Sequence, residues 1–153
     1  MSEPKTTILV VDDQQIARHA LETMLNDEYD VITAASGRDA IDVALARLPD
    51  LVLLDVLMPG MNGVEVCQKL QNDPLTQQIP VIFITGLDDR ETEESGFQAG
   101  AVDYIYKPPV AASVKARIRV QLKRKQQIRF IEAVATGYLN DPDKIRQTAK
   151  ELL

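Results

Sequence analysis

Four short apolar segments of this chain end abruptly in polar or turn-forming residues. Residues 8–11 run into Asp12-Asp13, residues 51–54 into Asp55, residues 81–84 into Thr85-Gly86, and residues 104–106 into Lys107-Pro108. Continuous apolar runs of this length are typical of strands that are buried on both faces of a parallel sheet. Ligand sites of open α/β sheets lie beyond the carboxyl ends of the strands. We therefore expect the polar residues that follow these strands to converge at one edge of one sheet.

The residues expected at this edge combine three acids, a hydroxyl and an ammonium: Asp12, Asp13, Asp55, Thr85 and Lys107. Carboxylates that lie close together repel one another unless a cation lies between them, and Mg2+ prefers carboxylate oxygens and water as ligands. A metal ion beside an ammonium and a hydroxyl can also neutralise and bind the oxygens of a phosphoryl group. Because an Asp side chain can attack phosphorus and form an acyl phosphate, the pattern predicts an Mg2+-dependent phosphoryl-transfer site.

Helix signals separate the apolar segments at regular intervals. We expect helices over residues 15–25, 37–48, 64–70 and about 88–99, a further strand over residues 29–34, and Ser36 as an N-cap. The residues expected to face the core are Ile16, Ala20, Leu21, Met24 and Leu25 in the first helix and Ala40, Ile41, Ala44 and Leu45 in the second. Five strand–helix units with right-handed crossovers predict an α/β fold: a three-layer, doubly wound, five-stranded parallel sheet in flavodoxin-like order, with an extended C-terminal helix.

The order and spacing of these motifs resemble the receiver domain of the two-component response-regulator family. The residues that carry the resemblance are Asp12-Asp13, Asp55, the Met-Pro-Gly-Met-Asn-Gly loop of residues 58–63, Thr85-Gly86, Tyr104 and Lys107-Pro108. The resemblance covers roughly residues 6–120, and we expect residues 1–120 to form the receiver domain.

This resemblance implies a role for each matching residue. Asp55 would be the phosphoacceptor, and Asp12, Asp13 and Asp55 would hold Mg2+ together with the backbone carbonyl of Leu57. Thr85 would be the switch hydroxyl, Gly86 the small residue that leaves room for the phosphoryl group, and Tyr104 the switch aromatic. Lys107 would contact the phosphoryl group, and the bond between Lys107 and Pro108 would be cis. A histidine kinase, a phosphotransfer protein or a small phosphodonor would supply the phosphoryl group.

Each of these residues also has a simpler interpretation when it is taken alone. Asp13 could serve only as the N-cap of the helix that starts near Gln14. Thr85 alone would more often be a turn residue, and Tyr104 a half-buried strand aromatic. Lys107 could be a surface charge whose extended backbone is explained by the following proline. The presence of all of them in one pattern favours the functional interpretation.

Composition places the chain among soluble proteins. No run approaches the roughly 20 apolar residues that are needed to cross a bilayer, and the first residues lack the features of a signal peptide. The single cysteine, Cys67, excludes an internal disulfide and fits a reducing cytoplasm, where we expect the protein to act. His19 is expected on the surface of the first helix rather than in a metal site.

The last third of the chain reverses the charge of the rest. Residues 1–107 hold 7 Lys and Arg against 19 Asp and Glu, whereas residues 108–153 hold 10 against 4. We expect one long helix over residues 110–137, with residues 121–153 forming a helical extension beyond the receiver. Three interpretations remain open for it: a solvated linker helix, a coiled-coil homodimer seam interrupted by Lys125, or a nucleic-acid contact. The last is the least favoured, because no base-reading element is visible.

A final short helix is expected after Gly137, with Asp141 as its N-cap and Pro142 at its first position. Its apolar stripe of Ile145, Ala149 and Leu152 is expected to find no partner within the chain. Two explanations are compatible with such a stripe: a longer regulator whose output domain is missing from this sequence, or a dimer that covers the stripe. By analogy, long helices of this kind connect receivers to effector domains.

The pattern thus predicts a phosphorylation switch, a signalling module with self-phosphorylation and autodephosphorylation chemistry rather than a metabolic enzyme. Three alternatives are weaker. An Mg2+-dependent aspartyl-phosphate phosphatase would carry an Asp-x-Asp motif after the first strand, where this chain has Asp12-Asp13-Gln14. A nucleotide-binding α/β domain would show a glycine-rich turn after that strand. A non-phosphorylated interaction module would not need the complete set of acids, hydroxyl and lysine.

Overall fold

The computed structural model describes residues 5–86 and 90–153. Within these ranges five strands form one parallel sheet in the order β2-β1-β3-β4-β5, as predicted for a flavodoxin-like α/β fold. The strands are β1 (Thr7–Val11), β2 (Asp30–Ala34), β3 (Leu51–Leu54), β4 (Val81–Thr85) and β5 (Asp103–Tyr106). Every residue of β3 and β4 is buried, which explains their uninterrupted apolar sequences.

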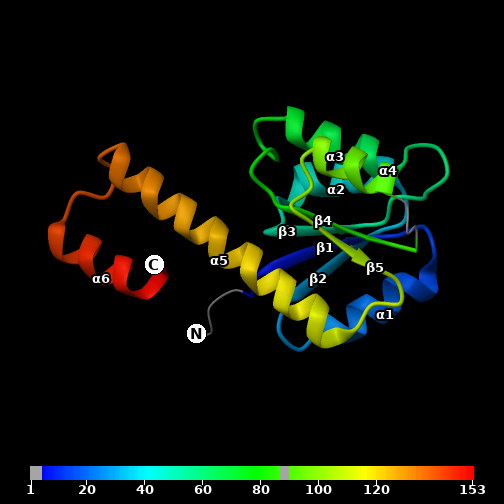
Figure 1. The fold of residues 1–153 in the computed structure, drawn as a ribbon, viewed down its shortest axis with the longest axis horizontal. Helices are drawn as coiled ribbons and strands as arrows, with labels where there is room; N and C mark the ends of the chain where they lie inside the picture. The colour runs from blue at the N-terminus through cyan, green and yellow to red at the C-terminus, as the bar shows by residue number, and fades with distance from the viewer. Residues whose placement is uncertain (1–4, 87–89) are drawn as a thin grey trace. The chain divides into compact units, whose positions relative to one another are not determined.

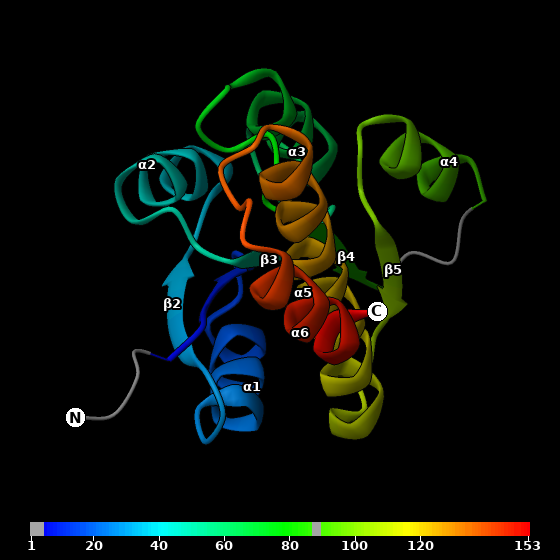
Figure 2. The same cartoon turned by 90° about the vertical axis from the view of Figure 1, so that its left-hand side faces the viewer.

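Helices cover both faces of the sheet (Figures 1 and 2). The helices are α1 (Gln15–Leu25), α2 (Gly37–Arg47), α3 (Gly63–Asn72), α4 (Arg90–Gln98), α5 (Ala111–Ala135) and α6 (Pro142–Leu152). One face is covered by α2, α3 and α4, and the other by α1 and the first turn of α5. Lys115 in that turn lies 3.2 Å from Glu28 and 3.4 Å from Asp27, which follow α1. The predicted three layers are therefore confirmed.

The chain forms two compact units, Met1–Lys115 and Ala116–Leu153. The first contains the whole sheet and its covering helices. The second contains the rest of α5 and α6, which runs back alongside the second half of α5 (Figures 1 and 2). None of the helices within residues 5–86 and 90–153 is both long and apolar enough to cross a bilayer.

The helix ends follow the predicted capping chemistry in two places. The hydroxyl of Ser36 accepts a hydrogen bond from the backbone N–H of Asp39 at the start of α2. The carboxylate of Asp141 accepts from the N–H groups of Asp143 and Lys144 at the start of α6. The fourth helix was predicted to begin near Asp88, but Asp88 and Asp89 lie outside the described residues.

Two predicted core positions in α1 are wrong. Ile16 is 87% exposed and Ala20 is also exposed, whereas Leu21 and Leu25 are buried. The predicted stripe spanned about half of the helix circumference, and only one edge of it faces the sheet. Leu45 of α2 is likewise exposed, although Ala40 and Ala44 of the same helix are buried as predicted.

The apolar stripe of α6 does have a partner within the chain, contrary to the prediction. Ile145, Ala149 and Leu152 are each partly buried in the second unit. In the same unit the side-chain amide of Gln127 donates a hydrogen bond to the backbone carbonyl of Leu152, and Phe130 is buried. The prediction is wrong because α5 and α6 form a helical hairpin, and sequence periodicity does not show which helices pair.

Candidate functional site

The predicted site residues follow the ends of neighbouring strands. Asp12 comes directly after β1 and Asp55 directly after β3, and the last residues of these strands, Val11 and Leu54, are paired. The backbone N–H of Asp55 donates to the carbonyl of Val11 at 2.9 Å. On the other side of β3, Thr85 ends β4, and its carbonyl accepts from the N–H of Lys107 at 2.9 Å. The sheet therefore brings these residues to a common edge, as predicted.

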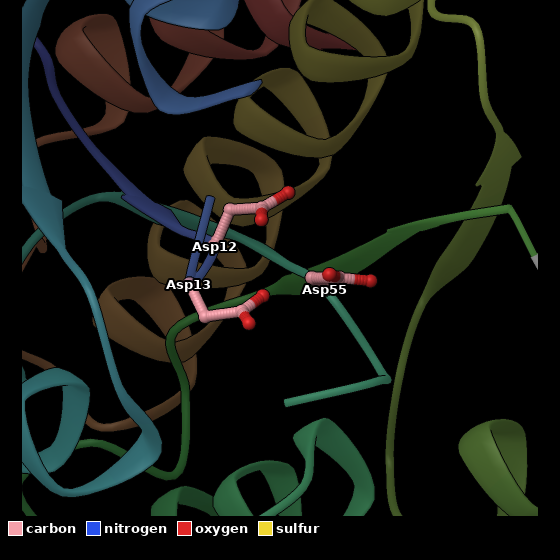
Figure 3. Close-up of side chains that lie close together, drawn as sticks. All are labelled: Asp12, Asp13 and Asp55. Atoms are coloured by element: carbon pink, nitrogen blue, oxygen red, sulfur yellow. The ribbon is translucent and has the colours of Figure 1, made fainter. Parts of the chain in front are cut away.

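Three carboxylates form a cluster at this edge (Figure 3). Asp12, Asp13 and Asp55 each offer one carboxylate oxygen, and these oxygens all lie within 4.8 Å of one another. Asp12 and Asp55 are buried, whereas Asp13 is exposed. Oxygens of this kind at this separation suit a hard cation such as Mg2+. The cluster therefore could bind a metal ion.

Lys107 connects two members of the cluster. Its ammonium donates to a carboxylate oxygen of Asp12 at 2.7 Å and lies 3.6 Å from Asp55 Oδ2. Burial alone would lower the pKa of Lys107, but the hydrogen bond to Asp12 and the charges of Asp55 and Asp12 together raise it. The lysine is thus held in its charged form beside the acids.

Asp55 has the unusual titration expected of a buried acid. Burial raises the pKa of Asp55, and the positive charge of Lys107 only partly offsets this effect. The neighbouring Asp12 raises the pKa further, and the backbone N–H groups of Leu57 and Val56 lower it. Ionised Asp55 therefore carries a free-energy cost that a second cation beside it would reduce.

The N-capping interpretation of Asp13 is wrong. The N-cap residue of α1 is Gln14, and its side chain makes no capping hydrogen bond. The backbone N–H of Gln14 donates instead to a carboxylate oxygen of Asp12 at 3.0 Å. Helix capping therefore does not explain the presence of Asp13, whose carboxylate belongs to the acidic cluster.

The loop after Asp55 is fixed by a close backbone contact at Gly63. A Cβ atom at Gly63 would lie 2.2 Å from the carbonyl oxygen of Asp55, so only glycine fits there. The backbone N–H of Gly63 also donates to the carbonyl of Val56 at 2.8 Å. Leu57 is exposed, and the role of its carbonyl as a metal ligand stays a prediction.

The residues of the predicted switch lie next to the acidic cluster along the sheet. Thr85 is buried, and no heavy atom lies within 4 Å of the position that a Cβ of Gly86 would occupy. Tyr104 is buried, with its ring centroid 5.6 Å from that of Phe83, 6.2 Å from Phe97 and 5.4 Å from Tyr106. The switch roles of Thr85, Gly86 and Tyr104 stay predictions. The cis bond between Lys107 and Pro108 is confirmed.

One polar residue at this site was not predicted from the sequence. Arg18 of α1 donates from Nη1 to the backbone carbonyl of Asp12 at 2.7 Å. No periodic or motif signal marks this arginine, because its partner is a main-chain atom of a residue outside the helix. His19 is exposed, as predicted, and the single cysteine, Cys67, is buried.

Comparison with known proteins agrees with this geometry. The family model described as "Response regulator receiver domain" matches residues 8–119. The "Response regulator PleD" of Caulobacter vibrioides is 47% identical over 113 residues, which are 73% of this chain and 25% of that protein. The "Probable transcriptional regulator ycf27" of Guillardia theta is 36% identical over 140 residues, which are 90% of this chain and 54% of that protein.

Solved structures show the same fold. The chain superimposes on a structure described as "BeF3 Activated DrrB Receiver Domain" with a TM-score of 0.72 and 30% identity, covering 78% of this chain and 98% of that one. Against the curated relatives, the chain spans only about a quarter of PleD and about half of the ycf27 protein. The chain therefore belongs to the response regulator receiver domain family of two-component signal transduction.

Proposed function

We propose that this chain is a phosphorylation switch in which Asp55 accepts a phosphoryl group. The observation that carries the proposal is the Asp12–Asp13–Asp55 cluster with Lys107 placed between two of its members. Neighbouring acids of this kind need cations, and a phosphoryl group needs the same cations. A site built only for stability would not bury two carboxylates at the edge of a sheet.

The donor set fits Mg2+. Asp12, Asp13 and Asp55 supply carboxylate oxygens, and the backbone carbonyl of Leu57 is proposed as a further ligand. Bound there, Mg2+ would neutralise charge on the phosphoryl oxygens and leave room for water in its coordination shell. The three carboxylates follow the ends of two adjacent strands, β1 and β3, whereas the Leu57 carbonyl belongs to the loop after Asp55.

The reaction proposed for Asp55 is an in-line displacement at phosphorus. A carboxylate oxygen of Asp55 forms the new bond, and the bond from phosphorus to the donor's nitrogen or oxygen breaks. The electron pair of that bond leaves with the donor. Lys107, held 3.6 Å from Asp55, would interact with the phosphoryl oxygens by its positive charge. Autodephosphorylation would be the attack of water on the same phosphorus, which breaks the bond to the Asp55 oxygen, regenerates the Asp55 carboxylate and releases inorganic phosphate.

The response to phosphorylation is proposed to pass through Thr85 and Tyr104. A phosphoryl group at Asp55 would accept a hydrogen bond from the hydroxyl of Thr85, and Gly86 leaves open space beside it. A displacement of Thr85 changes the room available to Tyr104, whose ring lies against Phe97 of α4. Differential contacts of this kind shift the population between two states of α4 and β5.

The partners proposed for this switch are a sensor histidine kinase or phosphotransfer protein on the input side. Ile16, in the first turn of α1 after Asp12 and Asp13, is exposed, and so is Leu57 in the loop after Asp55, so each of these segments offers an apolar side chain to a partner. On the output side, residues 1–120 would act as the receiver and residues 121–153 as a helical extension. That extension would contact an output domain or a second copy of the chain.

The proposal is tested with beryllofluoride, a mimic of the phosphoryl group, observed by fluorine NMR. Bound fluorine resonances should appear with Mg2+, disappear when Mg2+ is removed, and be absent in Asp55→Asn. An Asp42→Asn variant, which changes an exposed acid, serves as the matched control and should bind normally. Bound signals that survive in Asp55→Asn would contradict the proposal. No bound signal in the natural protein would favour a non-phosphorylated interaction module.

A further inference from the structure

Arg18 reaches back from α1 to the acidic cluster. Its Nη1 atom donates to the backbone carbonyl oxygen of Asp12 at 2.7 Å, a short hydrogen bond from a charged group. The side chain of Arg18 is partly buried, and its own backbone N–H donates to the carbonyl of Gln14 at 3.1 Å. Unlike Lys107, this cation is hydrogen-bonded to a main-chain oxygen and not to a carboxylate.

Asp12 is held from several directions. Its backbone N–H donates to the carbonyl of Ala34 in β2 at 3.2 Å. Its carboxylate accepts from the N–H of Gln14 and from the ammonium of Lys107. The contact from Arg18 adds a restraint on the carbonyl, the group that leads into the next residue. Asp13, by contrast, is an exposed member of the cluster.

The restraint on the Asp12 carbonyl also orients Asp13. A peptide unit is planar, so a fixed carbonyl oxygen fixes the plane that contains the nitrogen and Cα of the following residue. The direction of the bond from Cα to Cβ of Asp13 depends on that plane. Arg18 therefore limits the directions in which the Asp13 carboxylate can point, although Asp13 precedes α1 and Arg18 lies within this helix.

We propose that Arg18 is a positioning residue of the acidic cluster, which holds the Asp12–Asp13 peptide so that the Asp13 carboxylate faces Asp55. This inference rests on the proposed function, because it assumes that the cluster binds Mg2+. Mg2+ demands nearly ideal octahedral geometry, so an acid that is oriented in advance binds it more tightly. Residues that orient metal ligands typically change metal affinity about 10- to 100-fold when they are replaced.

The test is calorimetric titration of the unphosphorylated protein with MgCl2. Arg18→Met keeps the apolar stem of the side chain but is shorter and removes every donor, and it should weaken Mg2+ binding by about tenfold or more. Arg18→Lys keeps a charged donor and should recover binding to within about threefold of the natural protein. Arg47→Met is the matched control, because Arg47 is an exposed arginine that pairs with Asp30 at the opposite edge of the sheet.

A second measurement separates orientation from folding. In Mg2+-free buffer, the amide and Cα resonances of Asp12 and Asp13 should shift in Arg18→Met, while thermal unfolding stays close to that of Arg47→Met. If Arg18→Met does not fold, Arg18→Gln, which keeps one amide donor without the charge, replaces it and should also bind Mg2+ more weakly.

The outcomes are distinct. A natural protein that binds no Mg2+ would overturn the proposed function and this inference with it. A natural protein that binds Mg2+, together with a folded Arg18→Met that binds it within twofold, would overturn this inference alone. Equal loss of binding in Arg18→Met and Arg47→Met would assign the effect to net charge, and it would also overturn the positioning role.

Discussion

The ammonium of Lys107 lies 2.7 Å from a carboxylate oxygen of Asp12, a residue 95 positions away in the sequence. The Asp12 side chain is 2% exposed and that of Lys107 26% exposed, so water screens this pair only in part. Without metal, Lys107 is therefore a counter-ion of the acidic cluster. A bound cation would also neutralise the carboxylates of the cluster and would change the balance of charge around Lys107.

Replacing Lys107 by Met should destabilise the protein in Mg2+-free buffer and leave Mg2+ affinity unchanged or higher. The loss should be on the order of 2 kcal/mol, less than for a fully buried pair, because Lys107 is partly exposed. Urea unfolding with and without Mg2+ measures this, and Mg2+ should restore more stability to Lys107→Met than to the natural protein. Lys69→Met, at an exposed position of α3, is the control. Equal stability of both variants without Mg2+ would contradict the counter-ion role.

Asp55→Asn should stabilise the protein at neutral pH, by about 1 kcal/mol. The folded state raises the pKa of Asp55, so the folded protein binds this proton more tightly than the unfolded chain does. The ionised form is therefore penalised above the folded pKa, and the penalty disappears as the pH falls below the ordinary value of 3.8. Denaturation of both proteins from pH 7 downward should show their difference shrinking. A difference that grows toward acid would mean that the pKa is lowered instead.

Gly63→Ala and Gly60→Ala should differ strongly in cost. A Cβ at Gly63 would lie 2.2 Å from the Asp55 carbonyl, so the backbone of the phosphoacceptor has to move. This change should cost at least about 3 kcal/mol and also weaken Mg2+ binding. Gly60 has a φ of +76° with open space around it, so alanine there should cost only about 1 kcal/mol. Similar unfolding free energies for the two variants would show that the loop yields easily at Gly63.

Cys67 should be unreactive in the native protein. It is fully buried in α3, and its thiol donates to the carbonyl of Ala99 at 3.5 Å. Burial raises the pKa of Cys67 to about 11, so almost no thiolate exists at pH 8. An aromatic disulfide reagent at pH 8 should report no thiol in the native protein and one thiol in urea. Rapid labelling without urea would reveal opening of the contact between α3 and the end of α4.

Most of the fold could be predicted from the sequence, because strands that are buried on both faces consist of continuous apolar residues. Local sequence signals were sufficient for the strands β3 and β4 and for the N-caps Ser36 and Asp141. The tertiary structure keeps all of them as predicted. The sequence is a weaker guide to which side of an amphipathic helix faces the core. Ile16 fits the helical period of α1, but it is exposed because the buried face of the helix is narrower than the predicted apolar stripe.

Some residues of the candidate site could be predicted from the sequence and others could not. The topology rule for parallel sheets placed Asp12, Asp55, Thr85 and Lys107 at one edge, and the structure brings them there. Arg18 could not be found in this way, because it donates to a main-chain oxygen whose position appears only in the folded chain. Gly63 belongs to the loop motif that the sequence shows, but its close approach to the Asp55 carbonyl also appears only in the folded chain. The partner of α6 was missed because sequence periodicity does not show which helices pair.

Phosphorylation of Asp55 is tested most simply by intact-mass spectrometry after incubation with acetyl phosphate, with and without Mg2+. We expect a single phosphoryl adduct that requires Mg2+, is absent in Asp55→Asn and forms normally in Asp42→Asn. No adduct in the natural protein, or an adduct that survives in Asp55→Asn, would contradict the assignment of Asp55 as the phosphoacceptor.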